Sequence, residues 1–220
     1  ASETDESGSA PEPGLEAFIQ ARIFESNGMY REAITAYKRA MEADPDVREI
    51  RIRYASLLLD LGMSDRAVNV LEASDELDWY GTRVLALALA QDSARNPGSH
   101  EAAEAALRKA LAERDDDPNL QLSLAQVLHR QGRPAEAEEV ISRLRQARGG
   151  SPQLTAYHAG LLRELGRKQE ASQVYAECAA VQFVGSVDCR ESVVQLLLEL
   201  GRPGEAGELM LQWLNDTDLD

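Results

Sequence analysis

The residues with which this chain could do chemistry are few and scattered. Its three histidines, His100, His129 and His158, fall in different segments of the sequence. No pair of histidines or cysteines has the spacing of a metal site, and the sequence contains no glycine-rich phosphate loop and no nucleophile elbow. The 38 aspartates and glutamates are spread as they are on solvated helix faces. We therefore predict no catalytic residue, no metal site, no cofactor and no enzymatic activity.

Regularly spaced glycines indicate which elements make up the chain. Six of them follow one another at intervals of 34, 36, 34, 34 and 35 residues: Gly28, Gly62, Gly98, Gly132, Gly166 and Gly201. An apolar helix end precedes most of these glycines, and an alanine stands five residues after each one, as Ala67 does after Gly62. Such a period is typical of stacked helix hairpins. We predict an all-α chain of about six hairpins and no strands.

The first repeat carries a family resemblance. Its glycine turn and second helix resemble the tetratricopeptide repeat in residue type and spacing, at Gly28, Tyr30, Ala33, Tyr37, Ala40 and Pro45. Later repeats keep the glycine and the alanine, and the third has a longer turn over residues 93–100 that is a candidate contact surface. The resemblance covers residues 15–213. It implies a right-handed superhelical solenoid of about six tetratricopeptide hairpins.

We expect three parts along the sequence. Residues 1–14 form a disordered acidic leader, because they offer no large apolar side chain to offset the entropy of ordering. An acidic tail covers residues 215–220. The solenoid lies between them, over residues 15–214, with repeats at about 15–47, 48–76, 77–116, 117–150, 151–185 and 186–214.

The net charge and the hydropathy of the chain limit which partners and which cellular locations we expect. The formal net charge of −15 repels phosphate backbones, so we predict no nucleic acid partner. The longest apolar run, residues 84–90, is far shorter than the roughly 20 residues that span a bilayer, so we predict no membrane span. The leader resembles the tether of bacterial lipoproteins, which implies a lipid anchor upstream and a periplasmic or outer-membrane assembly factor. The alternative is a cytosolic chaperone or secretion adaptor of the same fold.

The resemblance also implies where a protein or peptide partner binds. In tetratricopeptide arrays the first helix of each hairpin lines a concave groove. Carried over repeat by repeat, the predicted groove-binding residues are Phe18, Arg22, Ile52, Ser56, Leu85, Leu89, Leu122, Gln126, His129 and Arg163. This set is apolar in its middle and polar at its ends.

Two further features concern the last repeats. Cys178 ends one predicted helix and Cys189 opens the next, so the pair is either a disulfide that joins the fifth and sixth repeats or a buried apolar residue with an incidental thiol. The last helix has no following helix to cover it. Trp213 therefore either anchors an interface, which includes a homo-oligomer through the C-terminal repeat, or folds back onto the preceding helix.

Overall fold

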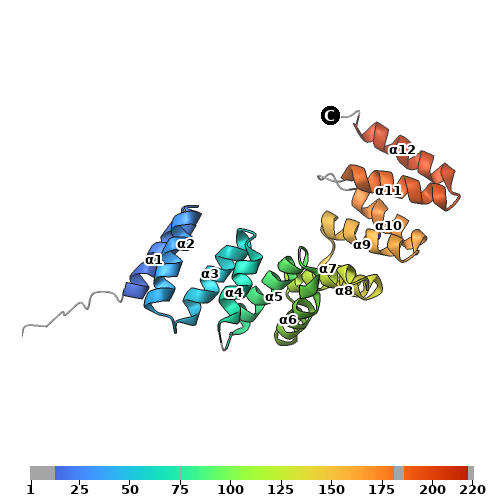
Figure 1. Ribbon diagram of the computed structural model, residues 1–220. Helices are drawn as coiled ribbons and strands as arrows, with labels where there is room; N and C mark the ends of the chain where they lie inside the picture. The colour runs from blue at the N-terminus through green and yellow to red at the C-terminus, as the bar shows by residue number, and fades with distance from the viewer. Residues whose placement is uncertain (1–12, 75, 181–185, 218–220) are drawn as a thin grey trace, which may run out of the picture. The chain divides into compact units, whose positions relative to one another are not determined.

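The computed structural model describes residues 13–74, 76–180 and 186–217. Within them the chain forms twelve α-helices and one short 3-10 helix, with no strand (Figure 1). The all-α fold of successive hairpins predicted from the sequence is confirmed. The first helix begins at residue 13 and the last ends at residue 217, so each extends slightly into the expected leader and tail. The rest of the leader and of the tail lies outside the described residues.

The chain divides into two compact units. Unit 1 comprises residues 1–113 and unit 2 residues 114–220. The helices of unit 1 are α1 (Pro13–Ser26), α2 (Tyr30–Ala43), α3 (Arg48–Asp60), α4 (Ser64–Glu72), α5 (Trp79–Ser93), the 3-10 helix η1 (Pro97–Ser99) and α6 (His100–Glu113). Those of unit 2 are α7 (Pro118–Arg130), α8 (Pro134–Arg148), α9 (Pro152–Glu164), α10 (Lys168–Ala179), α11 (Ser186–Glu199) and α12 (Pro203–Thr217).

Glycine turns close five of the hairpins. At Gly62, for example, φ is 73°, a left-handed conformation that glycine adopts without a steric penalty. The next residue, Met63, donates its backbone N–H to the carbonyl of Leu58 at 2.8 Å, which satisfies one of the free carbonyls at the end of α3. Gly98 differs from the other glycines of the series. It lies in η1 without a positive φ, within the longer turn that the sequence predicted for the third repeat.

Small residues allow the two helices of each hairpin to approach closely. The alanines that follow the glycines by five residues are completely or almost completely buried: Ala33, Ala67, Ala103, Ala137, Ala171 and Ala206. In unit 1 the larger Tyr37 fills the space beside them. Its ring lies 6.0 Å from that of Phe18 and 5.8 Å from that of Tyr54, so three helices share one aromatic contact.

A buried polar cluster joins α8, α9 and α10 in unit 2. His158 is 7% exposed, and its Nδ1 accepts a hydrogen bond from the Arg145 guanidinium at 2.7 Å. An arginine can only donate, so the proton of the neutral ring is on Nε2, which donates to Glu138 at 2.9 Å. Arg145 also pairs with Glu177 on α10. Both ring nitrogens of His158 thus form hydrogen bonds that hold neighbouring helices together.

A disulfide joins α10 to α11. The sulfur atoms of Cys178 and Cys189 are 2.09 Å apart, and the two Cα atoms are 6.0 Å apart. Both residues are buried in one apolar cluster with Val193 and Leu196 of α11. The cross-link therefore lies within the core of the last two hairpins rather than on their surface.

Candidate functional site

The first helices of unit 1 carry a connected set of polar side chains, which we call the unit 1 first-helix surface: Arg22, Glu25, Glu49, Arg53, Ser56, Asp60 and Tyr80. It begins on α1, where Arg22 pairs with Glu25 at 3.0 Å. The same carboxylate accepts a hydrogen bond of 2.6 Å from the hydroxyl of Tyr37 on α2. Burial, together with this contact to Glu25, raises the pKa of Tyr37. Glu25 is thereby held in place by two donors from different helices.

Arg53 occupies the centre of this surface. Its Nε donates to Glu49, one turn earlier on α3, at 2.6 Å. Its guanidinium carbon lies 5.4 Å from the ring centroid of Tyr80 on α5, a cation–π geometry. The Tyr80 hydroxyl in turn lies 3.3 Å from the hydroxyl of Ser56. These contacts fix a cation between a carboxylate and an aromatic ring while leaving its side chain partly exposed.

Asp60 brings a second negative charge toward Glu25. Partial burial and the charge of Glu25 both raise the pKa of Asp60. Asp60 is also the last residue of α3, where the helix dipole disfavours a carboxylate. A cation close to Asp60 would relieve this repulsion.

The apolar residues predicted for the groove in unit 1 are placed mainly in the core. Ile52 is 2% exposed and Leu89 is 8% exposed, which leaves little of either for a ligand. Ile52 is buried because Gly81 has no side chain, and a Cβ built there would lie 3.0 Å from its Cδ1. Phe18 and Leu85 are half-buried and pack against the same core. Of the predicted unit 1 positions, Arg22 and Ser56 are the ones that join the polar surface.

Unit 2 has a smaller polar group on its own first helices. His129 of α7 contacts Glu164 of α9 through Nε2 at 2.7 Å. The hydroxyl of Tyr157, also on α9, lies 3.3 Å from Nδ1 of the same histidine. Burial raises the pKa of Tyr157 to about 12, so it is a neutral phenol at physiological pH. The structure thus gives His129 two partners from the neighbouring hairpin.

The other predicted positions of unit 2 do not join this group directly. Leu122 is half-buried on α7, whereas Gln126 and Arg163 are exposed. Within the described part of unit 2, the hydrogen-bond partners of His129 are Glu164 and Tyr157 rather than either of these exposed side chains. Gln126 and Arg163 remain available to a partner, and their role in binding stays a prediction.

The last helix is open to solvent, although not at the residue that the sequence singled out. Trp213 is half-buried against the core of α10 and α11, and the guanidinium of Arg190 lies 5.3 Å from its ring. The exposed apolar side chains are its neighbours Met210, Leu211 and Leu214, of which Leu211 is 63% exposed. An interface at this end would therefore be built on these three, with Trp213 behind them.

Sequence reasoning missed Arg53, Tyr80, Tyr157 and Glu164. The predicted groove residues stand at fixed positions within each repeat, and all four of these residues lie off those positions. Arg53 follows the predicted Ile52 by one residue, and Glu164 follows the predicted Arg163 by one. Helical periodicity alone could have marked Arg53, because it stands four residues after the acidic Glu49 and such a pair supports a helix.

Neither a membrane-spanning helix nor a metal-binding cluster occurs in the described residues. None of their helices has the length and apolar character needed to cross a bilayer. No group of three or more histidine, cysteine, aspartate or glutamate side chains is arranged there to hold a metal ion.

Comparison with known proteins identifies the family. A family model described as the tetratricopeptide repeat matches residues 26–78 and 97–161, which together make up more than half of the chain. The chain belongs to the tetratricopeptide repeat family. Proteins of this family are non-catalytic scaffolds that bind other proteins, so a protein partner is expected and enzymatic activity is not. No protein with a curated description matches the chain.

Solved structures share the fold. The crystal structure of the MamA protein superposes with a TM-score of 0.68 at 18% identity, covering 80% of this chain and 100% of MamA. PilW, described as a type IV pilus biogenesis factor, gives 0.64 at 18% identity over 78% of this chain and 79% of its own. TTC0263, a thermophilic tetratricopeptide protein of Thermus thermophilus, gives 0.54 at 23% identity over 84% of this chain and 99% of its own. These similarities confirm the predicted solenoid of tetratricopeptide hairpins.

Proposed function

We propose that this chain is a scaffold that holds a segment of another protein on its first-helix surfaces and that it serves assembly in the bacterial envelope. The observation that carries the binding part is the unit 1 first-helix surface. It presents a fixed cation, Arg53, and a carboxylate pair, Glu25 and Asp60, whose repulsion a cationic partner side chain would relieve. A segment with both a basic and an acidic side chain matches this charge pattern.

Site-directed photocrosslinking in cells tests this proposal. A photoreactive amino acid at Ser56, on the unit 1 first-helix surface, should form a discrete crosslinked product. The matched control carries the photoreactive amino acid at Asn69, which is exposed on the second helix α4, and it should not form this crosslinked product. Two charge substitutions should then reduce the amount of the Ser56 product. Asp60→Asn removes a carboxylate that would bind the partner's basic side chain, and Arg53→Gln removes the cation that would bind its acidic side chain. Equal products from Ser56 and Asn69 would refute binding at the first-helix surface.

The disulfide supports the envelope location. Disulfides persist in oxidising compartments such as the periplasm and are rare in the cytosol of most organisms. PilW shows that the same fold occurs in a pilus biogenesis factor, which is one kind of envelope assembly factor. We further propose a lipid anchor upstream of the chain. Fractionation of native cells tests the envelope location. The intact mass of the native protein under non-reducing conditions tests the disulfide and the lipid anchor. Reduced cysteines in a soluble cytosolic fraction would favour a chaperone or secretion adaptor instead.

We also propose that α12 mediates contact between two copies of the chain. The exposed apolar side chains of Met210, Leu211 and Leu214 lie on this helix, with exposed Leu198 on α11. Light scattering should give a dimer mass for the natural chain and a monomer mass for Leu211→Glu. Gln212→Glu, an exposed charge change at the next position, is the control and should remain dimeric. A monomer for the natural chain across the micromolar range would refute this contact.

A further inference from the structure

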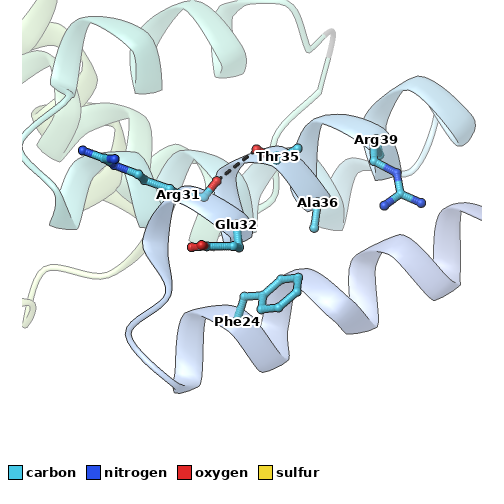
Figure 2. Close-up of a pocket in the computed structure, with 6 residues that line it drawn as sticks. All are labelled: Phe24, Arg31, Glu32, Thr35, Ala36 and Arg39. Atoms are coloured by element: carbon cyan, nitrogen blue, oxygen red, sulfur yellow. Dashed lines mark hydrogen bonds between the residues drawn. The ribbon is translucent and has the colours of Figure 1, made fainter.

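A pocket of about 330 Å³ lies on the first hairpin, mainly on its second helix, and shares no residue with the unit 1 first-helix surface. Five of its six lining residues come from the second helix α2 (Arg31, Glu32, Thr35, Ala36 and Arg39), and Phe24 comes from the end of α1. Figure 2 shows the Phe24 ring facing α2 near Ala36, with Arg39 toward one end of α2 and Arg31 toward the other, the guanidinium of Arg31 directed away from Phe24. The pocket thus has an apolar middle and a cation at each end.

The two arginines are not neutralised by the protein. Both are exposed, and neither forms an ion pair with any residue that the structure describes. Elsewhere in unit 1, Arg22, Arg53 and Arg108 each pair with a glutamate on the same helix. In a chain of net charge −15, two guanidinium groups and the one carboxylate of Glu32 give this pocket a net positive charge, the opposite sign to that of the whole chain.

The polar atoms between the arginines suit a peptide backbone. The Thr35 hydroxyl already donates to the carbonyl of Arg31 at 3.0 Å, so its lone pairs are free to accept a hydrogen bond from a ligand. The carboxylate of Glu32 can likewise accept a backbone N–H. It also leaves the pocket with one net positive charge, which limits attraction of polyanions such as nucleic acid.

The distance between the two arginines indicates which backbone conformation a bound peptide would have. They stand eight residues apart on one helix, which corresponds to about 12 Å along its axis and about 80° around it, a difference in direction that the long arginine side chains can bridge by bending. In an extended chain, residues i, i+2 and i+4 face the same side, and i and i+4 lie about 13 Å apart. Two acidic side chains at i and i+4 would reach both arginines. An apolar side chain at i+2 would then meet the half-buried Phe24, beside which Ala36 is already buried in the core.

We propose that this pocket binds an extended segment of a partner protein with the pattern acidic, any residue, apolar, any residue, acidic. The arginines hold the two carboxylates, and the apolar side chain fills the middle of the pocket. This site is independent of the first-helix surface, because its cations and its apolar floor belong to different residues. The chain would then hold a partner at two faces of its first hairpin.

Fluorescence anisotropy with the full chain tests the proposal, using a labelled peptide Gly-Ser-Glu-Ser-Leu-Thr-Glu-Ser-Gly as the probe. The double variant Arg31→Gln, Arg39→Gln should weaken binding at least tenfold. The matched control is Lys38→Gln, Lys109→Gln, which removes the same charge from exposed positions outside the pocket and should change affinity less than twofold. A peptide with the central leucine replaced by serine should also bind at least fivefold more weakly.

Three outcomes would overturn the proposal. The first is equal loss in the two double variants, which would show general charge attraction. The second is equal or tighter binding of hexaglutamate or of a single-stranded oligonucleotide, which would show a polyanion site. The third is no binding of the leucine peptide up to millimolar concentration while circular dichroism shows the chain folded. All of the substituted side chains are exposed, so loss of folding is not expected in either variant.

Discussion

Replacing Gly132 by alanine should destabilise unit 2, because the turn between α7 and α8 needs a backbone conformation that alanine disfavours. The φ angle of Gly132 is 76°, and no atom lies within 4 Å of the place where a Cβ would stand. The cost is therefore one of backbone conformation, roughly 1–2 kcal/mol, rather than of collision. Alanine also restricts the unfolded chain, which returns about 0.4–1 kcal/mol. We expect the free energy of unfolding to fall by about 1 kcal/mol.

Gly207 provides the matched control within the same unit. It lies inside α12 without a positive φ, and a Cβ there would also meet no atom within 4 Å. Alanine is favoured over glycine by about 1 kcal/mol in a helix interior, so Gly207→Ala should stabilise unit 2. Gly132→Asn should cost less than Gly132→Ala, because asparagine tolerates the left-handed conformation.

Urea unfolding followed by tryptophan fluorescence measures these changes. Of the two tryptophans, Trp79 lies in unit 1 and Trp213 in unit 2, so a Trp79→Phe background reports on unit 2. The denaturant slope should stay constant while the midpoints of the two alanine variants move in opposite directions. If Gly132→Ala unfolds at the natural midpoint or above it, or if both variants shift the same way, the argument from the turn conformation is refuted.

Three further perturbations address the charged and cross-linked sites. Asp60→Asn should raise the free energy of unfolding at pH 7 by a few tenths of a kcal/mol, because the raised pKa means that the ionised carboxyl opposes folding. The gain is small because the side chain is only partly buried and the solvent screens its charge. In a Glu25→Gln background this gain should shrink, and a loss of stability in the natural background would contradict the reasoning. Burial raises the pKa of Tyr157 from 10.0 to about 12, so its contribution is constant below pH 10 and is lost between pH 10 and 12, at about 1.4 kcal/mol per pH unit. Urea titrations over this range should show a smaller loss for Tyr157→Phe, and identical losses would argue against the burial of the phenol. Reductant should lower the free energy of unfolding by up to about 3 kcal/mol in the natural chain and leave Cys178→Ala, Cys189→Ala unaffected, whereas equal urea midpoints with and without reductant would disprove a stabilising disulfide.

The hairpins were predictable because each one is specified locally. A glycine such as Gly62 is needed where the chain turns, and an alanine such as Ala67 is needed where the helices touch, so both recur in the sequence at the period of the structure. Gly98 has the spacing of the other glycines but not their left-handed conformation, because the longer turn around it forms a 3-10 helix instead.

The residues of the unit 1 first-helix surface were less predictable, because their exposure depends on contacts between repeats. Whether Ile52 faces a ligand or the core is decided by how closely α5 approaches, and that distance is set by Gly81 in the next repeat. The contact of Arg53 with Tyr80 likewise depends on the relative register of α3 and α5. A rule that works within one repeat cannot give either result.

The disulfide has a consequence for how this protein is made. Cys178 and Cys189 are the only two cysteines of this sequence, so one intramolecular pairing exists within it. Oxidative folding then requires an oxidant but no isomerase to shuffle bonds. The two residues are also only 11 positions apart, on consecutive helices, so the bond can form as soon as α11 packs against α10. Protein produced in a reducing cytoplasm should therefore acquire its native cross-link by simple oxidation after purification.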